Sequence, residues 1–324
     1  MKVLFIGGTG IISSACSELA IEKGITLYHL NRGLSHRKIE GVNQISGDIR
    51  NKLEVKNILL NYTFDVVVNW ICYTPEHIQN DLEIFKGKTG QYIFISSASA
   101  YQKPPQRLPI TEETPLDNPF WQYSRDKIAC ERLLMEEFHK NKFPATIVRP
   151  SHTYDQTLVP SDWGYTVLDR IMKGKKVIIH GDGTSLWTLT HHRDFAKGFL
   201  GLLGNRQAIG EAFHITSDEL LPWNKIYELM AKEAGIPLNA IHIPSDFIAK
   251  IDPRVEGSLL GDKAHSMIFD NSKIKSLVPD FKATIKFEDG VKEIIKWYRE
   301  NPERQVVNEA TNDLIETIIK KYER

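Results

Sequence analysis

The sequence predicts an α/β fold in which a doubly wound parallel sheet is followed by a smaller, irregular C-terminal region. Over the first 150 residues, apolar runs alternate with amphipathic stretches, as in repeated strand–helix–strand units. The apolar runs are nearly continuous, which is typical of strands buried on both faces of a parallel sheet. Beyond about residue 150 this alternation gives way to loops rich in Gly, Pro, Asp and His.

The elements of the first part follow in chain order from this periodicity. Apolar runs predict strands, and apolar side chains at helical spacing predict the helices between them. The predicted strands span residues 2–7, 25–31, 43–48, 64–71, 91–97 and 145–150. The predicted helices span residues 11–23, 52–62, 75–86 and 121–140.

The chain is expected to divide into three parts. Residues 1–150 form the sheet domain, and residues 151–302 form a second region, some of which returns to the sheet. Residues 303–324 carry apolar side chains at helical spacing and predict a C-terminal helix. We expect this helix to pack on its own domain, with a partner chain as the alternative.

Composition argues against two classes of partner. Lys+Arg and Asp+Glu both number 41, so the formal net charge is zero and no basic excess favours nucleic acid. No apolar run is long enough to cross a bilayer, and the first residues turn glycine-rich too soon for a signal peptide. We therefore expect neither a nucleic-acid partner nor a membrane.

The cysteines and histidines predict no metal site. Cys16, Cys72 and Cys130 are scattered without metal-ligand spacing, which fits a reducing compartment and predicts a cytoplasmic location. His191 and His192 are adjacent on one segment, and such a pair does not by itself make a ligand set. The expected role of the three thiols is that of buried, inert side chains.

A glycine turn, "GGTGIIS", directly follows the first predicted strand. Gly7 and Gly10 fit a pattern that allows a tight turn and a close approach of the backbone to a pyrophosphate, with Ser13 at the third small position. The pyrophosphate would sit at the helix N-terminus, so Ile11 and Ile12 belong to the predicted site. A purely structural turn is the alternative. This context predicts a Rossmann-like dinucleotide-binding domain.

The end of the second strand bears on which cofactor is used. An acidic residue there would bind the ribose 2′-hydroxyl of NAD, whereas arginine accommodates the 2′-phosphate of NADP. This chain has Asn31 in place of the acid, followed by Arg32 and, five residues later, Arg37. We therefore expect NADP(H) to be favoured over NAD(H). Asp48 and Ile49, after the third strand, are expected near the adenine.

The stretch "YSRDK" places Tyr123 and Lys127 four residues apart on a predicted helix. Residues at this spacing lie on one helix face. A nearby ammonium lowers the pKa of a phenol, and such a tyrosine can exchange a proton with a substrate hydroxyl. The alternative is a solvated helix face that carries the two side chains by chance.

Taken in order along the chain, these motifs resemble the extended short-chain dehydrogenases/reductases of the NAD-dependent epimerase/dehydratase family. The resemblance covers roughly residues 1–300. It implies that Ser97, Tyr123 and Lys127 are catalytic, with Ser99 as the alternative serine. Further motifs that carry it are "GDIR", "FISSASAY", "ITEETPL", "RPSHTYD", "GDGTS", "RDFA", "FHIT" and "FDNSKIKSLVPDF".

The resemblance also implies roles for residues at the ends of the fifth and sixth strands. Ser96 and Pro150 would line the cofactor. Ser99, His152 and Trp187 would face the substrate, although His152 is equally expected as a loop histidine with internal partners. The implied reaction moves a hydride between nicotinamide and a secondary alcohol or ketone, with Tyr123 as the general acid/base.

Two of the departures from the family bear on a phosphate-bearing substrate. Trp187 stands where the family places an arginine for a nucleotide diphosphate. Just before Gly261-Asp262, near the place of a second arginine, stand Ser258, Leu259 and Leu260. Neither an aromatic nor an aliphatic side chain pairs with phosphate, so a UDP-sugar substrate is not expected unless other cations substitute. The possible substitutes are Arg193, Arg254, Lys263 and His265.

The functional prediction is an NAD(P)-dependent oxidoreductase or epimerase acting on a sugar-like small molecule. The alternative is a non-catalytic cofactor-sensing or RNA-binding protein on the same fold, because fold alone does not decide function. The complete Ser97, Tyr123 and Lys127 set favours the enzyme. Because family members often pair through the helix that carries Tyr-x-x-x-Lys, the resemblance also implies a homodimer.

Overall fold

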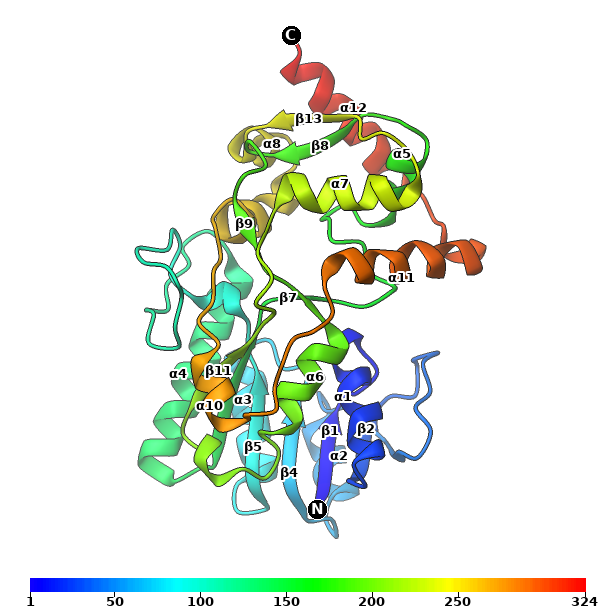
Figure 1. Cartoon of the computed structure of the whole chain (residues 1–324). Helices are drawn as coiled ribbons and strands as arrows, with labels where there is room; N and C mark the ends of the chain where they lie inside the picture. The colour runs from blue at the N-terminus through cyan, green and yellow to red at the C-terminus, as the bar shows by residue number, and fades with distance from the viewer.

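A computed structural model describes all 324 residues and confirms the predicted fold class. Its centre is a seven-stranded parallel sheet with the strand order β11-β6-β5-β4-β1-β2-β3 (Figure 1). The order reverses between β1 and β4, which opens a crevice at the carboxyl ends of these strands. The strands are β1 (Lys2–Ile6), β2 (Thr26–Asn31), β3 (Asn43–Ser46), β4 (Phe64–Asn69), β5 (Thr89–Ile95), β6 (Ala145–Pro150) and β11 (Ala212–Ile215).

Helices cover both faces of the sheet, which explains why its central strands are largely apolar, whereas only Ile45 of the edge strand β3 is buried. One apolar cluster joins the sheet to α1 (Ile11–Glu22), α6 (His192–Leu200) and α10 (Ser272–Leu277). A second cluster joins the opposite face to α2 (Lys52–Ile58), α3 (Pro75–Phe85) and α4 (Gln122–Asn141). The sheet is thus the middle layer of three.

The remaining residues form a second region beyond the carboxyl edge of the sheet, around its own apolar cluster (Figure 1). Three small two-stranded sheets organise it: β7 (His152–Tyr154) with β10 (Leu189–His191), β8 (Val177–His180) with β13 (Ala240–Ile243), and β9 (Leu186–Trp187) with β12 (Leu221–Pro222). The helices are α5 (Tyr165–Met172), α7 (Trp223–Ala234), α8 (Ser245–Ile251), α9 (Glu256–Ser258), α11 (Phe287–Glu300) and α12 (Glu309–Tyr322). A π-helical turn, η4 (Leu259–Lys263), follows α9.

The structure differs from the sequence prediction mainly in lengths and in one late strand. The second predicted helix ends at Ile58, and the C-terminal helix begins at Glu309 rather than at residue 303. That helix buries Ile315, Ile318 and Ile319 in the cluster of the second region. The seventh strand, β11, comes from the second half of the chain, which therefore contributes to both parts.

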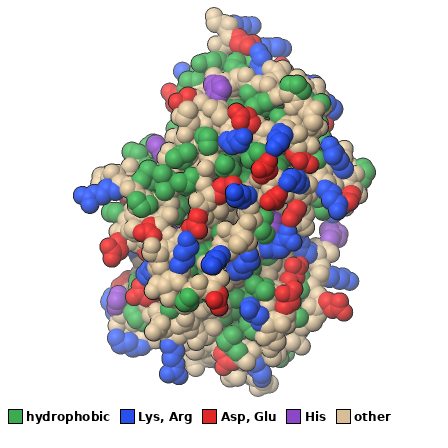
Figure 2. Space-filling view, viewed as in Figure 1, with side chains coloured by type: hydrophobic (Ala, Val, Ile, Leu, Met, Phe, Trp, Pro, Cys, Tyr) green, Lys and Arg blue, Asp and Glu red, His purple; other side chains and the backbone are tan.

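The outer surface carries both signs of charge. Figure 2 shows acidic and basic side chains interspersed over the visible face. None of the twelve helices combines the length and the apolar character that a membrane crossing requires.

Candidate active site

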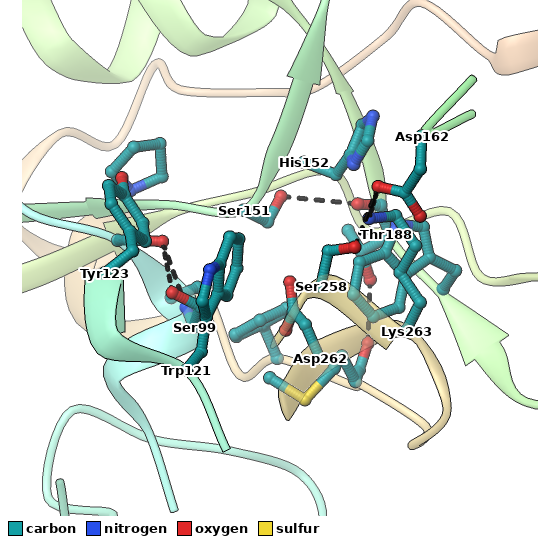
Figure 3. A pocket seen from close by; sticks show the side chains of 16 residues that line it. Ser99, Trp121, Tyr123, Ser151, His152, Asp162, Thr188, Ser258, Asp262 and Lys263 are labelled. Atoms are coloured by element: carbon teal, nitrogen blue, oxygen red, sulfur yellow. Dashed lines mark hydrogen bonds and ion pairs between the residues drawn. The ribbon is translucent and has the colours of Figure 1, made fainter. Parts of the chain in front are cut away.

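A cavity of about 310 Å³ lies between the sheet domain and the second region. Ser97 follows β5, Tyr123 lies in the first turn of α4, and Pro150 ends β6, so the sheet domain supplies one wall. Figure 3 shows Tyr123 and Ser99 on one side of the cavity and His152, Asp162 and Lys263 on the other. The residues of the second wall include Ser151, His152, Asp162, Trp187, Thr188, Ser258, Asp262, Lys263, Met267 and Phe269.

Tyr123 and Lys127 share one face of α4, as their spacing predicts. The Lys127 ammonium is buried and donates to the backbone oxygens of Cys72, at 2.6 Å, and Ile95, at 2.7 Å. These carbonyls follow β4 and end β5, so the lysine connects α4 to two strand ends. Its Nζ lies 5.6 Å from the centre of the Tyr123 ring.

The electrostatics of this pair differ from the expectation. Burial raises the pKa of Tyr123 to about 12, and a hydrogen bond with Ser97 partly opposes this rise. Burial therefore outweighs any lowering by Lys127, whose ammonium donates to two backbone carbonyls and lies over the tyrosine ring. Burial lowers the pKa of Lys127 itself to about 8.

Ser97 and Ser99, the two candidate catalytic serines, have different positions. The Ser97 hydroxyl lies 2.9 Å from that of Ser99, which in turn accepts from the buried Ser124 hydroxyl at 2.8 Å. Ser97 is half-buried beside Tyr123, whereas Ser99 is buried behind it. Ser99 therefore supports Ser97 from behind, and Ser97 is better placed for the reacting oxygen.

The glycine turn fits the pyrophosphate of a dinucleotide. Gly7 and Gly8 adopt positive φ angles of 97° and 107°, and α1 begins directly after Gly10. The backbone N–H groups of Ile11, Ile12 and Ser13 have no acceptor within the protein. Free N–H groups at the start of a twelve-residue helix form a binding site for an anion.

Position 8 requires a glycine, which the motif pattern did not reveal. A Cβ at this position would lie 2.5 Å from the ring of His29. His29 is buried on β2, and its Nε2 lies 2.9 Å from the Ser17 hydroxyl of α1. The turn thus packs directly on the sheet, a contact that depends on the fold and is invisible in the letters of the motif.

The end of β2 places the residues expected to select the cofactor. The Asn31 side chain is engaged locally, since it accepts from the Gly33 N–H and donates to Gln44. Arg32 has a side chain that is 63% exposed and lies 3.9 Å from the carboxylate of Asp48. Arg32 is therefore available at the strand end, only loosely paired.

Arg37 lies elsewhere than expected. Its guanidinium donates to the Gly10 carbonyl at 3.3 Å, to the Ser14 hydroxyl at 2.5 Å and to the Asp155 carboxylate at 2.9 Å. The buried Asp155 neutralises it, and the guanidinium stands beside the glycine turn rather than at the end of β2. The expectation that Arg37 serves a 2′-phosphate is corrected accordingly.

Two further expected cofactor contacts have side chains that point into the protein. The Ser96 hydroxyl donates to Glu131 at 2.5 Å, and Glu131 forms a buried ion pair with Arg149 of β6 at 2.6 Å. Ile49 packs in the apolar cluster beneath the sheet edge. Neither side chain is free for a cofactor, so only their backbone groups remain available.

The second wall holds both predicted and unpredicted residues. His152 and Trp187 line the cavity, and burial lowers the pKa of His152 to about 4, so this ring is neutral near pH 7. Sequence reasoning assigned no role to Asp162, whose segment carries no recognisable motif, or to Asp262, which only marked the late Gly-Asp pair of the family. Lys263, which was named only as a possible phosphate ligand, is paired with Asp162 at 2.8 Å.

Comparison with known proteins assigns the chain that carries this site to a family. The sequence model of the NAD dependent epimerase/dehydratase family matches residues 3–216. Over 73% of this chain, the sequence is 26% identical to the chloroplast stem-loop binding protein of 41 kDa b of Arabidopsis thaliana. Over 67% of this chain, it is 24% identical to 2'-dehydrokanamycin reductase of Streptomyces kanamyceticus. The matches span 64% and 62% of those proteins.

The fold is also that of solved enzymes. UDP-glucuronic acid 4-epimerase from Bacillus cereus, solved with UDP-glucuronic acid and NAD, superposes with a TM-score of 0.74 at 19% identity. The superposition covers 93% of this chain and 99% of the epimerase. With the family match over residues 3–216, these comparisons confirm the resemblance: the chain belongs to the NAD-dependent epimerase/dehydratase family.

Proposed function

We propose that this protein is an NAD(P)-dependent oxidoreductase or epimerase that acts on a secondary alcohol or ketone of a sugar-like molecule. The observation that carries the proposal is the meeting of Ser97, Tyr123 and Pro150 at one cavity wall, with Lys127 directly behind. The relatives support this class, since one is named a reductase and a structural neighbour is a sugar epimerase.

The proposed roles follow from the contacts. A nicotinamide held at this wall would supply or accept the hydride. Ser97 hydrogen-bonds the reacting oxygen, and Tyr123 gives a proton to it or takes one from it. The raised pKa keeps Tyr123 protonated, which suits it to protonate a carbonyl oxygen during reduction. Lys127 holds the ends of β4 and β5 together and, with its remaining N–H, would hold the nicotinamide ribose.

The first test is the absorbance spectrum of the purified protein, followed by NADPH and NADH titrations. A tightly held, non-exchanging cofactor supports an epimerase, in which the same hydride returns to the substrate. Weak, reversible binding supports a reductase that exchanges cofactor in each turnover. The variant Tyr123→Phe should bind cofactor normally and lose about 10²–10⁴-fold in turnover. Failure to bind either nucleotide would refute the proposal.

We also propose a preference for NADP(H) over NAD(H), carried by Arg32. Its exposed guanidinium at the end of β2 is suited to a 2′-phosphate, whereas the charge of Arg37 is neutralised by Asp155. The variant Arg32→Ala should weaken NADPH binding about tenfold and leave NADH binding nearly unchanged, since only NADPH offers the extra phosphate. Equal dissociation constants for the two cofactors in the unaltered protein would contradict this preference.

A non-catalytic RNA-binding or cofactor-sensing role is the second candidate, because one relative is named a stem-loop binding protein. The mixed charges of the visible face do not favour RNA (Figure 2). A gel-shift titration with stem-loop RNA tests it directly. Saturable binding that is unaffected by Tyr123→Phe would support this role.

We further propose a cytoplasmic homodimer. The three cysteines are free and buried, which supports a reducing compartment. In the family, pairing uses the helix of the Tyr-x-x-x-Lys motif, which here is α4, beside α3 on one face of the sheet. Sedimentation equilibrium that shows only monomer would refute the dimer.

A further inference from the structure

We propose that the cavity accepts a polyhydroxylated substrate without phosphate, bound through its hydroxyl or amino hydrogens, and rejects nucleotide diphosphate sugars. This inference rests on the proposed function, since it specifies the substrate class of the same site. It is drawn from the charged groups of the second wall and from the partners to which they are bound.

The cations near the cavity are already engaged. Lys263 pairs with Asp162 at 2.8 Å, and its side chain is 8% exposed. Lys103, which is fully buried, reaches Asp262 from behind the wall, also at 2.8 Å. No arginine lines the cavity. A diphosphate carries two negative charges, so its entry would require one of these pairs to break within a partly desolvated site.

The carboxylates, in contrast, retain acceptor capacity. Asp162 uses one oxygen for both Lys263 and the Ser258 hydroxyl, and its other oxygen has no partner. Asp262 likewise engages one oxygen with Lys103 and leaves the second without one. Both side chains are partly exposed, at 22% and 18%. A carboxylate accepts hydrogen bonds only, so these oxygens suit hydroxyl or amino groups of a ligand.

Two of these groups belong to the π-helical turn. Ser258 ends α9, and Asp262 and Lys263 lie at the end of η4, which follows it, so residues four and five positions apart line the same cavity. Asp162 comes from the loop before α5 and meets them there, as Figure 3 shows.

Trp187 supplies an independent observation. It lines the same cavity with 3% of its surface exposed, and its Nε1–H has no acceptor in the protein. An indole offers a flat apolar face that suits the C–H groups of a sugar ring, together with one donor. The cations that could have replaced a phosphate ligand are engaged elsewhere: Arg193 with Glu293, Arg254 with Asp252, and His265 with the Leu260 carbonyl.

The test compares three probes by calorimetry on the NADPH complex: kanamycin, which bears amino groups, maltotriose, which bears only hydroxyls, and UDP-glucose. At least one of the two sugars should bind at least tenfold more tightly than UDP-glucose. The tighter of the two identifies amino or hydroxyl hydrogens as the feature recognised. Asp162→Asn should weaken sugar binding about tenfold and strengthen UDP-glucose binding, because it frees the Lys263 ammonium.

Asp262→Asn is the second variant and should act in the same direction by freeing Lys103. Asp182→Asn is the matched control, since Asp182 lies outside the cavity and bonds to Thr184. Tighter binding of UDP-glucose than of both sugars would overturn the inference, as would unchanged UDP-glucose affinity in both cavity variants. Titration of NADPH in the same samples, and of the probes without it, separates this failure from failure of the proposed function.

Discussion

At the scale of single residues, Gly8 has the most sharply defined requirement. Its φ of 107° disfavours any side chain, and an added Cβ would lie 2.5 Å from the His29 ring. Gly8→Ala should destabilise the fold by more than about 2 kcal/mol, because strain and overlap add. It should also weaken NADPH binding, since the turn would shift. Denaturant unfolding and a fluorescence titration measure the two effects.

Gly24 offers the matched control for this prediction. It also has a positive φ, of 72°, but nothing lies within 4 Å of the place a Cβ would occupy. Gly24→Ala should therefore show the conformational strain alone, about 1 kcal/mol, with cofactor affinity unchanged. Equal effects of the two substitutions would show that the His29 contact has no energetic weight.

The hydrogen-bonded hydroxyls of Ser97, Ser99 and Ser124 give a second prediction at this scale. Ser97→Ala removes the hydroxyl beside Tyr123 and should reduce turnover at least about 100-fold. Ser99→Ala removes only the hydroxyl behind it, which joins Ser97 to Ser124. It should reduce turnover about tenfold, because Ser97 remains but is less firmly positioned. A larger loss for Ser99→Ala would reverse the roles of the two serines.

Sequence reasoning at this scale succeeded where the partners are close in the chain. Tyr123 and Lys127 share a helix face, so spacing alone predicted their proximity. Arg37 was misplaced because its partner, Asp155, is 118 residues away. The cofactor roles of Ser96 and Ile49 were inferred from motif position, which does not reveal that both side chains point inward.

At the scale of elements, a buried ion pair links α4 to strand β6 of the sheet. Glu131 and Arg149 are almost fully buried and lie 2.6 Å apart. Glu131→Gln leaves an uncompensated guanidinium and should destabilise the protein by about 3–5 kcal/mol. Glu136→Gln, on an exposed position of the same helix, should leave the unfolding midpoint nearly unchanged. Equal stability of the two variants would contradict this account of the buried pair.

The C-terminal helix α12 yields a second prediction for an element. Ile318 is fully buried in the cluster of the second region, and the helix is also held by the pair between Arg170 and Glu316. Ile318→Ala should cost about 2–5 kcal/mol through lost burial and a residual cavity. Thermal unfolding measures it, and Leu314→Ala, at a partly buried position, should cost less.

Most elements of the sheet domain could be predicted because their strands are apolar on both faces. β11 could not be predicted, since the strand has only four residues and lies beyond the point where the alternation of strands and helices ends. Neither could η4, because a π-helical turn is set by tertiary contacts rather than by local propensity. The predicted first wall of the site is therefore more complete than the second.

At the scale of the whole molecule, the cavity joins segments that are far apart in the chain. Asp162 and Lys263 meet across 101 residues, and Lys103 and Asp262 across 159. A single sequence carries no signal for such pairings, whereas the glycine turn and the Tyr-x-x-x-Lys helix are local motifs. This explains why sequence could predict the glycine turn and the helix face shared by Tyr123 and Lys127, but only His152 and Trp187 of the second wall.

The last prediction concerns acid stability, which depends on histidines throughout the fold. Burial lowers the pKa values of His29, His152, His180 and His192 to about 4, from 6.5. Between pH 6.5 and 4 the unfolded chain therefore binds protons that the folded protein does not, so stability falls as pH falls through this window. Asp81 opposes the trend, because burial raises its pKa to about 6.

Four histidines outweigh one aspartate in this balance, so the net effect should be acid lability. The thermal midpoint should drop by about 5 °C between pH 7 and pH 5, a loss of a few kcal/mol. It should change little between pH 7 and pH 8, where none of these five groups titrates and only Lys127, with a pKa of about 8, begins to release its proton. Calorimetric scans across this range measure the effect. A midpoint that does not change from pH 7 to pH 5 would mean that the buried histidines accept protons without opening the fold.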